Sequence, residues 1–186
     1  MNDQTIKAIV DEIAPELVKR AAGKVFQLTR ASLVIDFRTG VDRFLFLSIE
    51  PSAPRLYMIE RRPRDLEKQS IHDSSFAQLL RKHIGGARLL ALTKDAQDRI
   101  VRFFFAAEDI VGASYSRTLV AQLTGRAANL FLLDERDYII DALRTLRGEG
   151  QQIGDKYQSP AAATPALVSQ ASQPALAKAS FASLSE

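Results

Sequence analysis

The first seventeen residues carry apolar side chains at a helical spacing. These positions are Ile6, Val10, Ile13 and Leu17. Intervals of three and four residues place them on one face of an amphipathic helix. Pro15 lies inside this pattern, and because it has no N–H to donate, we expect a kink or a split near Ala14. Gly23 is the predicted stop of the helix.

The pattern then changes to short apolar runs separated by polar turns. β-Branched and aromatic residues are frequent in these runs, which is typical of strands. The predicted strands cover residues 24–29, 32–37, 44–49 and 55–60, with a turn at residues 38–40. Segment 61–70 is rich in basic residues and contains Pro63, so we predict an exposed loop there.

A second helix is predicted to begin at Asp73 or Ser74, both favourable N-cap residues. It should end at the pair Gly85-Gly86, with basic residues in its last turn that complement the helix dipole. Further strands are predicted at residues 87–93, 99–106, 119–123, 129–133 and 138–142. Because strands and helices do not alternate regularly, we predict an α+β fold class with mainly antiparallel sheets and a few helices.

The composition changes after residue 160. Sixteen of the 26 residues at positions 161–186 are Ala, Ser or Pro, and only Lys178 and Glu186 are charged. Such a segment buries too little apolar surface to offset the entropy of ordering it. We therefore expect one domain over residues 1–160 and a linker or disordered tail over residues 161–186. A linker at this position suggests further domains in a longer protein.

The residues needed for several classes of catalysis are missing from the sequence. There is no cysteine, and the only histidines, His72 and His83, do not have the spacing of metal ligands. Neither a phosphate-binding loop nor a nucleophile elbow occurs. We therefore expect a protein that is not an enzyme and has no catalytic residues, metal or cofactor. The sequence also has no apolar run of membrane-spanning length and no signal peptide, which predicts a cytoplasmic protein without membrane contact.

Basic residues are concentrated in the middle of the chain. Residues 55–102 hold eleven Arg or Lys against six Asp or Glu, whereas the whole chain has a net charge of only +3. The candidates for RNA or phosphate contact are Arg61, Arg62, Arg64, Arg81, Lys82 and His83. Clustered guanidinium groups suit phosphate because they donate hydrogen bonds in pairs. A solvated surface and, for His83, a half-buried position near a helix end remain open alternatives.

Asp98 and Arg99 form a second candidate site, directly before an apolar strand. One interpretation is an ion pair that stabilises a turn. The other is a polar pair that binds nucleic acid, with Arg99 on a phosphate or base edge and Asp98 on a base amine.

Four phrases of the sequence resemble, in order, those of the N-terminal domain of the NFACT family. They are LLRKHIGGA at residues 79–87, DRI at 98–100, LTGRAANL at 123–130 and GDKYQSP at 154–160. Ala128 replaces a serine of the family's third phrase. That family includes bacterial ribosome quality control factors, and its older name is fibronectin-binding protein A-like.

The resemblance implies a tRNA-binding and rRNA-binding module of ribosome quality control, a branch of protein biosynthesis. Family members bind the large ribosomal subunit that still carries peptidyl-tRNA. They recruit alanyl-tRNA, so that the stalled chain receives an untemplated C-terminal tail. The role in tRNA binding falls on Asp98 and Arg99. An early acid of the family corresponds to Asp3, with Asn2 and Thr5 as other candidates for that place.

Two other functions remain open at this stage. The implied fold is similar to the N-terminal domain of MutM-type DNA glycosylases, so one alternative is a MutM-like repair protein. Those enzymes use a proline directly after Met and then a glutamate, where this chain has Asn2 and Asp3. The second alternative is an adhesion or protein-interaction module of the fibronectin-binding type, as the older family name indicates.

Overall fold

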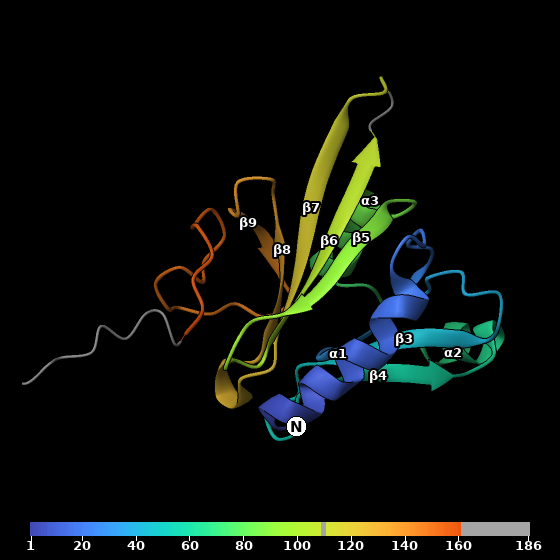
Figure 1. The fold of residues 1–186 in the computed structure, drawn as a ribbon, viewed down its shortest axis with the longest axis horizontal. Coiled ribbons are helices and arrows are strands. Elements are labelled where there is room, and N and C mark those ends of the chain that lie inside the picture. The colour runs from blue at the N-terminus through green and yellow to red at the C-terminus, as the bar shows by residue number, and fades with distance from the viewer. Residues whose placement is uncertain (109–110, 161–186) are drawn as a thin grey trace, which may run out of the picture.

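The computed structural model describes residues 1–108 and 111–160, and its elements form two antiparallel sheets with helices packed against them (Figure 1). The first sheet has the order β1-β2-β3-β4 and the second the order β5-β6-β7-β8-β9. This arrangement confirms the predicted α+β class. The predicted tail at residues 161–186 lies outside the described residues.

Helix α1 (Asp3–Leu17) buries the four apolar residues that the sequence pattern placed on one face. The Asn2 side chain caps it by accepting a hydrogen bond from the backbone N–H of Thr5 at 2.7 Å. The predicted split near Ala14 was wrong, because the helix continues through Pro15 and the N–H of Val18 still bonds to the Ala14 carbonyl. The proline stands in the last turn, where a lost N–H removes only one helical hydrogen bond.

The predicted stop of α1 at Gly23 was also wrong. The helix ends at Leu17, and Lys19 takes the left-handed conformation, with φ 73°, that a glycine often provides after a helix. A lysine in this position gives no stop signal in the sequence, so the prediction fell on the next glycine.

The first sheet is a meander of four short strands. They are β1 (Val25–Thr29), β2 (Ser32–Ile35), β3 (Arg43–Ser48) and β4 (Arg55–Glu60). Alternate residues point to opposite faces. On β3, Leu45 and Leu47 face the main core, whereas Phe44 and Phe46 face outward.

The predicted loop at residues 61–70 was wrong in part, because helix α2 (Pro63–Gln69) forms there. Pro63 occupies the first helical position, where its missing N–H costs nothing and its fixed φ favours the helix. Leu66 is fully buried against the outward face of the first sheet. A single apolar residue among charged neighbours gives no helical periodicity, which is why the sequence pattern missed this helix.

Helix α3 (Ser75–Ile84) starts at the N-cap Ser74 and ends at the predicted glycine pair. A Cβ atom on Gly85 would lie 2.5 Å from the carbonyl oxygen of Arg81, and Gly86 has a φ of +80°. Both positions therefore require glycine.

The second sheet begins after this pair. Its strands are β5 (Arg88–Lys94), β6 (Ile100–Glu108), β7 (Ser114–Gln122), β8 (Asn129–Leu133) and β9 (Ile139–Ala142), with the 3-10 helix η1 (Gly125–Ala127) before β8. Strand β7 starts five residues before the predicted strand at residues 119–123. Its early part alternates exposed and half-buried residues, so no apolar run marks it.

The largest core cluster combines α1, α3 and the inward faces of both sheets. Helix α1 contacts β4 and β5, so it lies across the junction of the two sheets (Figure 1). Within the described residues, no helix is long and apolar enough to cross a membrane.

Candidate nucleic-acid interface

Asp98 and Arg99 lie in the turn of residues 95–99, which joins β5 to β6. The turn closes through the N–H of Asp95, which donates to the carbonyl of Ile100 at 2.9 Å. Both Asp98 and Arg99 are half-buried, so their side chains remain within reach of a ligand. The Asp98 carboxylate accepts a hydrogen bond from the backbone N–H of Arg99 at 2.7 Å. Among the described residues, the Arg99 guanidinium forms no ion pair.

Asp95 and Arg102 hold this turn in place from inside the hairpin. Two guanidinium nitrogens of Arg102 donate to the two carboxylate oxygens of Asp95, each at 2.9 Å. These hydrogen bonds raise the pKa of Arg102, and burial opposes them. A bidentate pair of this kind fixes both direction and distance. The Asp95–Arg102 pair therefore holds the backbone of the turn in one conformation, from which the side chains of Asp98 and Arg99 project.

Asp3, the candidate for the early acid, lies beside the same turn. Its carboxylate forms an ion pair with the ammonium group of Lys94, the last residue of β5. The structure thus brings the N-terminus of α1 to the start of the turn that carries Asp98 and Arg99, although about ninety residues separate Asp3 from Lys94 in sequence. Of the other two candidates, Asn2 caps the helix, and the backbone of Thr5 donates to that cap.

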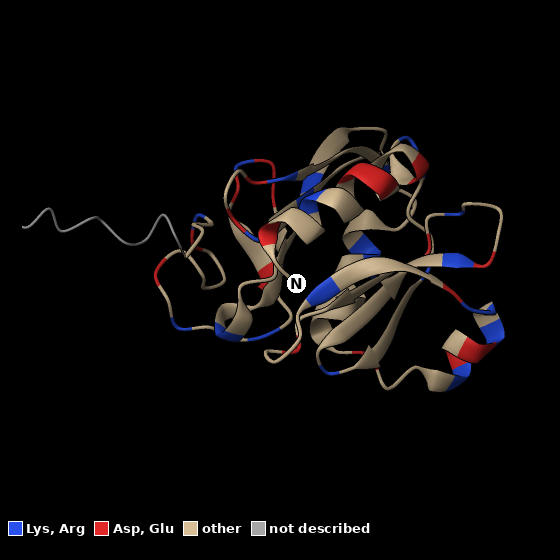
Figure 2. Ribbon diagram, turned by 60° about the horizontal axis from the view of Figure 1, so that its bottom comes forward, with Lys and Arg blue, Asp and Glu red and all other residues tan. Residues whose placement is uncertain are grey.

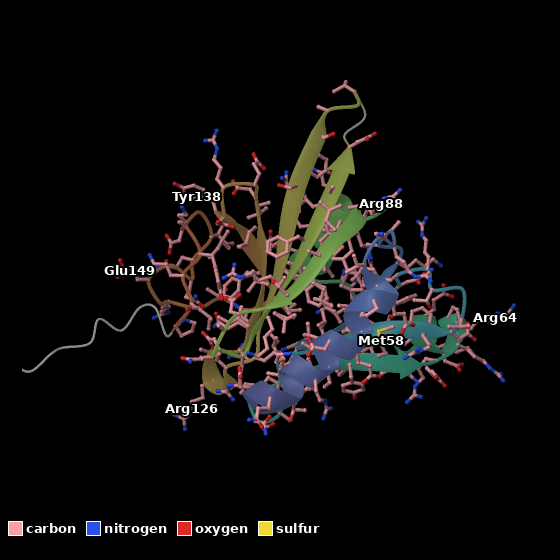
Figure 3. All side chains as sticks on the ribbon, in the orientation of Figure 1. Met58, Arg64, Arg88, Arg126, Tyr138 and Glu149 are labelled. Carbon is pink, nitrogen blue, oxygen red and sulfur yellow. The ribbon has the colours of Figure 1, made fainter. Side chains whose placement is uncertain are left out.

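Arg126 is a neighbour of this turn that the sequence-based site prediction did not include. The N–H of Leu123 donates to the carbonyl of Arg99 at 2.8 Å, so the segment that leads into η1 runs alongside the turn. Arg126 is exposed on η1 at this end of the molecule, near the N-terminus of α1 (Figures 1 and 3). Its place in the LTGRAANL phrase was the signal available in the sequence.

After β9, the segment that contains Tyr157 returns to the inner side of the 95–99 turn. The hydroxyl of Tyr157 donates to Oε1 of the buried Gln122 at 2.8 Å, and Arg102 lies 5.2 Å from the centre of the Tyr157 ring. Burial raises the pKa of Tyr157. The phrase at residues 154–160 therefore supports the inner side of the 95–99 turn and does not form a separate site.

Arg81 lies elsewhere and serves a structural contact. Its guanidinium forms an ion pair with Asp73, and its Nε donates to the backbone carbonyl of Val25 at 2.9 Å. These contacts fasten α3 to β1. Lys82, by contrast, is exposed.

His83 packs against β7 at the far end of the sheet from the turn. Its Nδ1 accepts a hydrogen bond from Nε of Arg117 at 3.3 Å, and its carbonyl accepts one from the Tyr115 hydroxyl at 3.3 Å. Burial lowers the pKa of His83, and the cations Arg117 and Lys82 lower it further. Arg117 pairs with Phe105, five residues along β6 from Ile100, which is roughly 16 Å at the usual strand rise.

Arg61, Arg62 and Arg64 are exposed on the first sheet's side of the molecule, at and before α2. Helix α2 carries both basic and acidic residues (Figure 2), and Arg64 projects at a different end of the molecule from Arg126 (Figure 3). The predicted basic residues thus form three separate groups and not one patch. Within residues 1–108 and 111–160, no group of acidic or histidine side chains is arranged to hold a metal.

Comparison with known proteins assigns the family. The family model described as NFACT N-terminal and middle domains matches residues 3–183, and the chain therefore belongs to this family. The protein named Rqc2 homolog RqcH from Streptococcus pneumoniae serotype 2 is 26% identical over 133 residues, covering 71% of this chain and 23% of that protein. The Rqc2 homolog RqcH from Bacillus subtilis is 28% identical over 125 residues, covering 66% of this chain and 21% of that protein. The chain thus spans under a quarter of the length of these curated relatives.

Solved structures share the fold. The N-terminal domain of the fibronectin-binding protein PavA from Streptococcus pneumoniae superposes with a TM-score of 0.75 at 23% identity, covering 84% of this chain and 60% of that one. The fibrinogen-binding protein from Staphylococcus aureus gives 0.69 at 24% identity, covering 83% and 54%. The family resemblance drawn from the four sequence phrases is confirmed.

Proposed function

We propose that this domain is an RNA-binding module of a ribosome quality control factor, and that Asp98 and Arg99 contact tRNA. One observation carries the proposal. The two side chains stand half exposed on a braced hairpin turn, and the Arg99 guanidinium has no carboxylate partner among the described residues. The curated relatives, named Rqc2 homologs, support the ribosomal context.

The chemistry of the pair suits a nucleic acid. A guanidinium donates paired hydrogen bonds to a phosphate or a base edge, and a carboxylate accepts from the amine of a base. Exposed Arg126 adds a further cation at the same end of the molecule. Because the turn is braced by Asp95 and Arg102, little ordering entropy is lost when a ligand binds.

In the full proposal the partner is alanyl-tRNA on a large ribosomal subunit that still carries peptidyl-tRNA. The domain positions the tRNA so that an untemplated C-terminal tail is added to the stalled chain in the cytoplasm. The peptidyl transferase centre of the ribosome forms the bonds. The domain itself then needs no catalytic residue, metal or cofactor.

The direct test is tRNA binding by fluorescence anisotropy with the 186-residue chain. The Arg99→Ala variant should bind tRNA about tenfold more weakly than the unmodified chain, as expected for the loss of one good bidentate contact. Arg136→Ala is the matched control. It removes one exposed arginine from the β8–β9 turn, at the opposite end of the same sheet. Equal loss in both variants would show that only net charge matters and would refute the site.

A second candidate function follows from the names of the structural relatives, which are fibronectin- or fibrinogen-binding proteins. Under that alternative the domain binds an extracellular matrix protein. Binding of the chain to immobilised fibronectin, measured in parallel with tRNA binding, distinguishes the two functions. Sub-micromolar binding to fibronectin with none to tRNA would favour adhesion over RNA binding.

A further inference from the structure

The outward face of the first sheet is only partly covered. Helix α2 places Leu66 against Phe26 and Phe44, and these side chains form a small core of their own together with Val34. Beyond the helix, Phe46 of β3 and Tyr57 of β4 face each other across the strands. Phe46 is half-buried, and 37% of Tyr57 is exposed. The β3–β4 side of this face thus leaves an aromatic pair accessible to solvent.

Arg55 extends this pair along the same face of the first sheet. The ring centroids of Phe46 and Tyr57 are 5.3 Å apart, with the rings tilted by 46°. Arg55 lies two residues before Tyr57 on the same face of β4, and its guanidinium carbon is 5.9 Å from the Phe46 centroid. Both aromatic rings and guanidinium groups offer a planar surface on which a base can stack. We call Phe46, Tyr57 and Arg55 the aromatic platform.

Basic residues lie beyond both ends of the platform. At the end where β3 and β4 pair through Ser48 and Arg55, the β1–β2 turn adds Arg30. The other end leads into α2. In the described part of the chain, none of the exposed basic residues Arg30, Arg55, Arg62, Arg64 and Lys68 forms an ion pair.

Acidic residues are also present near the platform. They are Glu50 at the first end and Asp42, Glu60, Asp65 and Glu67 at the second. Glu67 is neutralised by Lys24 at 2.9 Å, and Glu60 lies 4.0 Å from Arg43. The unpaired cations therefore remain the stronger charge at both ends.

We propose that the aromatic platform binds single-stranded RNA by stacking unpaired bases on Phe46 and Tyr57, with phosphates on the flanking basic residues. Aromatic side chains on an open sheet face, with cations on either side, bind bases that are not already stacked in a duplex. A base-paired helix hides the faces of its bases, so it offers nothing to the two rings. This surface belongs to the first sheet and is separate from the turn at residues 95–99.

The test is the binding of a fluorescently labelled ten-nucleotide oligouridylate to the 186-residue chain, followed by anisotropy. Tyr57→Ala should weaken binding about tenfold, because the ring supplies a stacking surface, and Tyr57→Phe should keep the affinity. Tyr138→Ala is the matched control, because Tyr138 is 44% exposed in the turn between β8 and β9, away from the first sheet. The large exposed fraction of Tyr57 makes misfolding of its alanine variant a minor concern, and a thermal melt checks it.

Three outcomes would overturn the platform, and the first two concern the rings themselves. One is equal affinity for a duplex of the same length, and the other is an unchanged affinity in Tyr57→Ala, since either leaves only charge attraction. The double variant Asp98→Ala, Arg99→Ala separates this proposal from tRNA binding at the turn. It should bind oligouridylate as the unmodified chain does. Loss of oligouridylate binding in that variant would show that single-stranded RNA binds at the 95–99 turn, and would refute binding at the platform.

Discussion

Asp3 and Lys94 form an ion pair that joins the first turn of α1 to the last residue of β5. The lysine side chain is only 7% exposed, whereas the aspartate side chain is 46% exposed. The buried member of the pair is therefore the cation. Its ammonium group also donates to the carbonyl of Asp95 at 2.9 Å, which ties the helix to the start of the 95–99 turn.

Replacing Asp3 with asparagine should lower the free energy of unfolding by about 1–2 kcal/mol, because a buried ammonium loses its counter-charge. Denaturant unfolding measures the change. Asp11→Asn is the matched control, since Asp11 pairs with Lys7 in the same helix and both side chains are more than 60% exposed. Its effect should stay within about 0.5 kcal/mol. An equal effect of both substitutions would contradict the structural role of the Asp3–Lys94 pair.

Arg81 and Lys82 should behave differently although they are neighbours. Arg81→Ala removes the contacts to Asp73 and Val25 and should destabilise the fold by about 1–3 kcal/mol. Lys82→Ala should leave stability within about 0.5 kcal/mol. If Lys82 contacts a phosphate, its loss lowers the salt dependence of RNA binding by about one unit of slope. Similar melting temperatures for the two variants would show that Arg81 does not fasten α3.

Tyr157→Phe should lower the free energy of unfolding by about 1–2 kcal/mol. The change deletes the hydroxyl that bonds to Gln122 at 2.8 Å and leaves a buried amide oxygen without that donor. Tyr138→Phe, at an exposed position, should have no measurable effect. Chemical denaturation of the two variants side by side provides the comparison, and equal stability of both would argue against the buried contact.

His83 should make the fold less stable in mild acid. Its pKa in the folded chain is below the ordinary value of about 6.5, owing first to burial and then to Arg117 and Lys82. As the pH falls through the ordinary value, the imidazole is protonated more readily in the unfolded chain than in the folded chain. The free energy of unfolding therefore decreases. The melting temperature should therefore drop less between pH 7 and pH 5.5 in His83→Gln than in the unmodified chain.

The exposed His72 provides the control for this pH effect. His72→Gln should retain the full drop in melting temperature of the unmodified chain. If the His83→Gln variant shows that same drop, the acid sensitivity comes from other groups and the prediction for His83 fails.

The sequence pattern predicts most of the fold because burial and periodicity coincide. The buried face of α1 follows directly from the spacing of Ile6, Val10, Ile13 and Leu17, and the glycine pair marks the end of α3. Helix α2 and the outer half of β7 escape detection. The first has one buried residue, Leu66, and the second alternates exposed and half-buried positions, so neither has an apolar signature.

The candidate site is predictable only in part. The position of Asp98–Arg99 before an apolar strand predicts a turn, but periodicity does not show that α1 brings Asp3 to it, because that contact depends on the packing of two distant elements. Arg81 shows the opposite limit. In sequence, a basic residue near a helix end resembles a phosphate ligand. Only the tertiary structure reveals that the Arg81 guanidinium already pairs with Asp73 and donates to a backbone carbonyl.

The position of Tyr157 sets a practical boundary for producing this domain. The last strand, β9, ends at Ala142, and a secondary-structure map alone would encourage truncation there. Such a fragment would uncover the ring of Phe131, which packs 5.1 Å from that of Tyr157, and would strip the cover from Arg102. A recombinant version should therefore extend through residue 160, because the segment after the final strand packs Tyr157 against Phe131 and completes the hydrophobic interior.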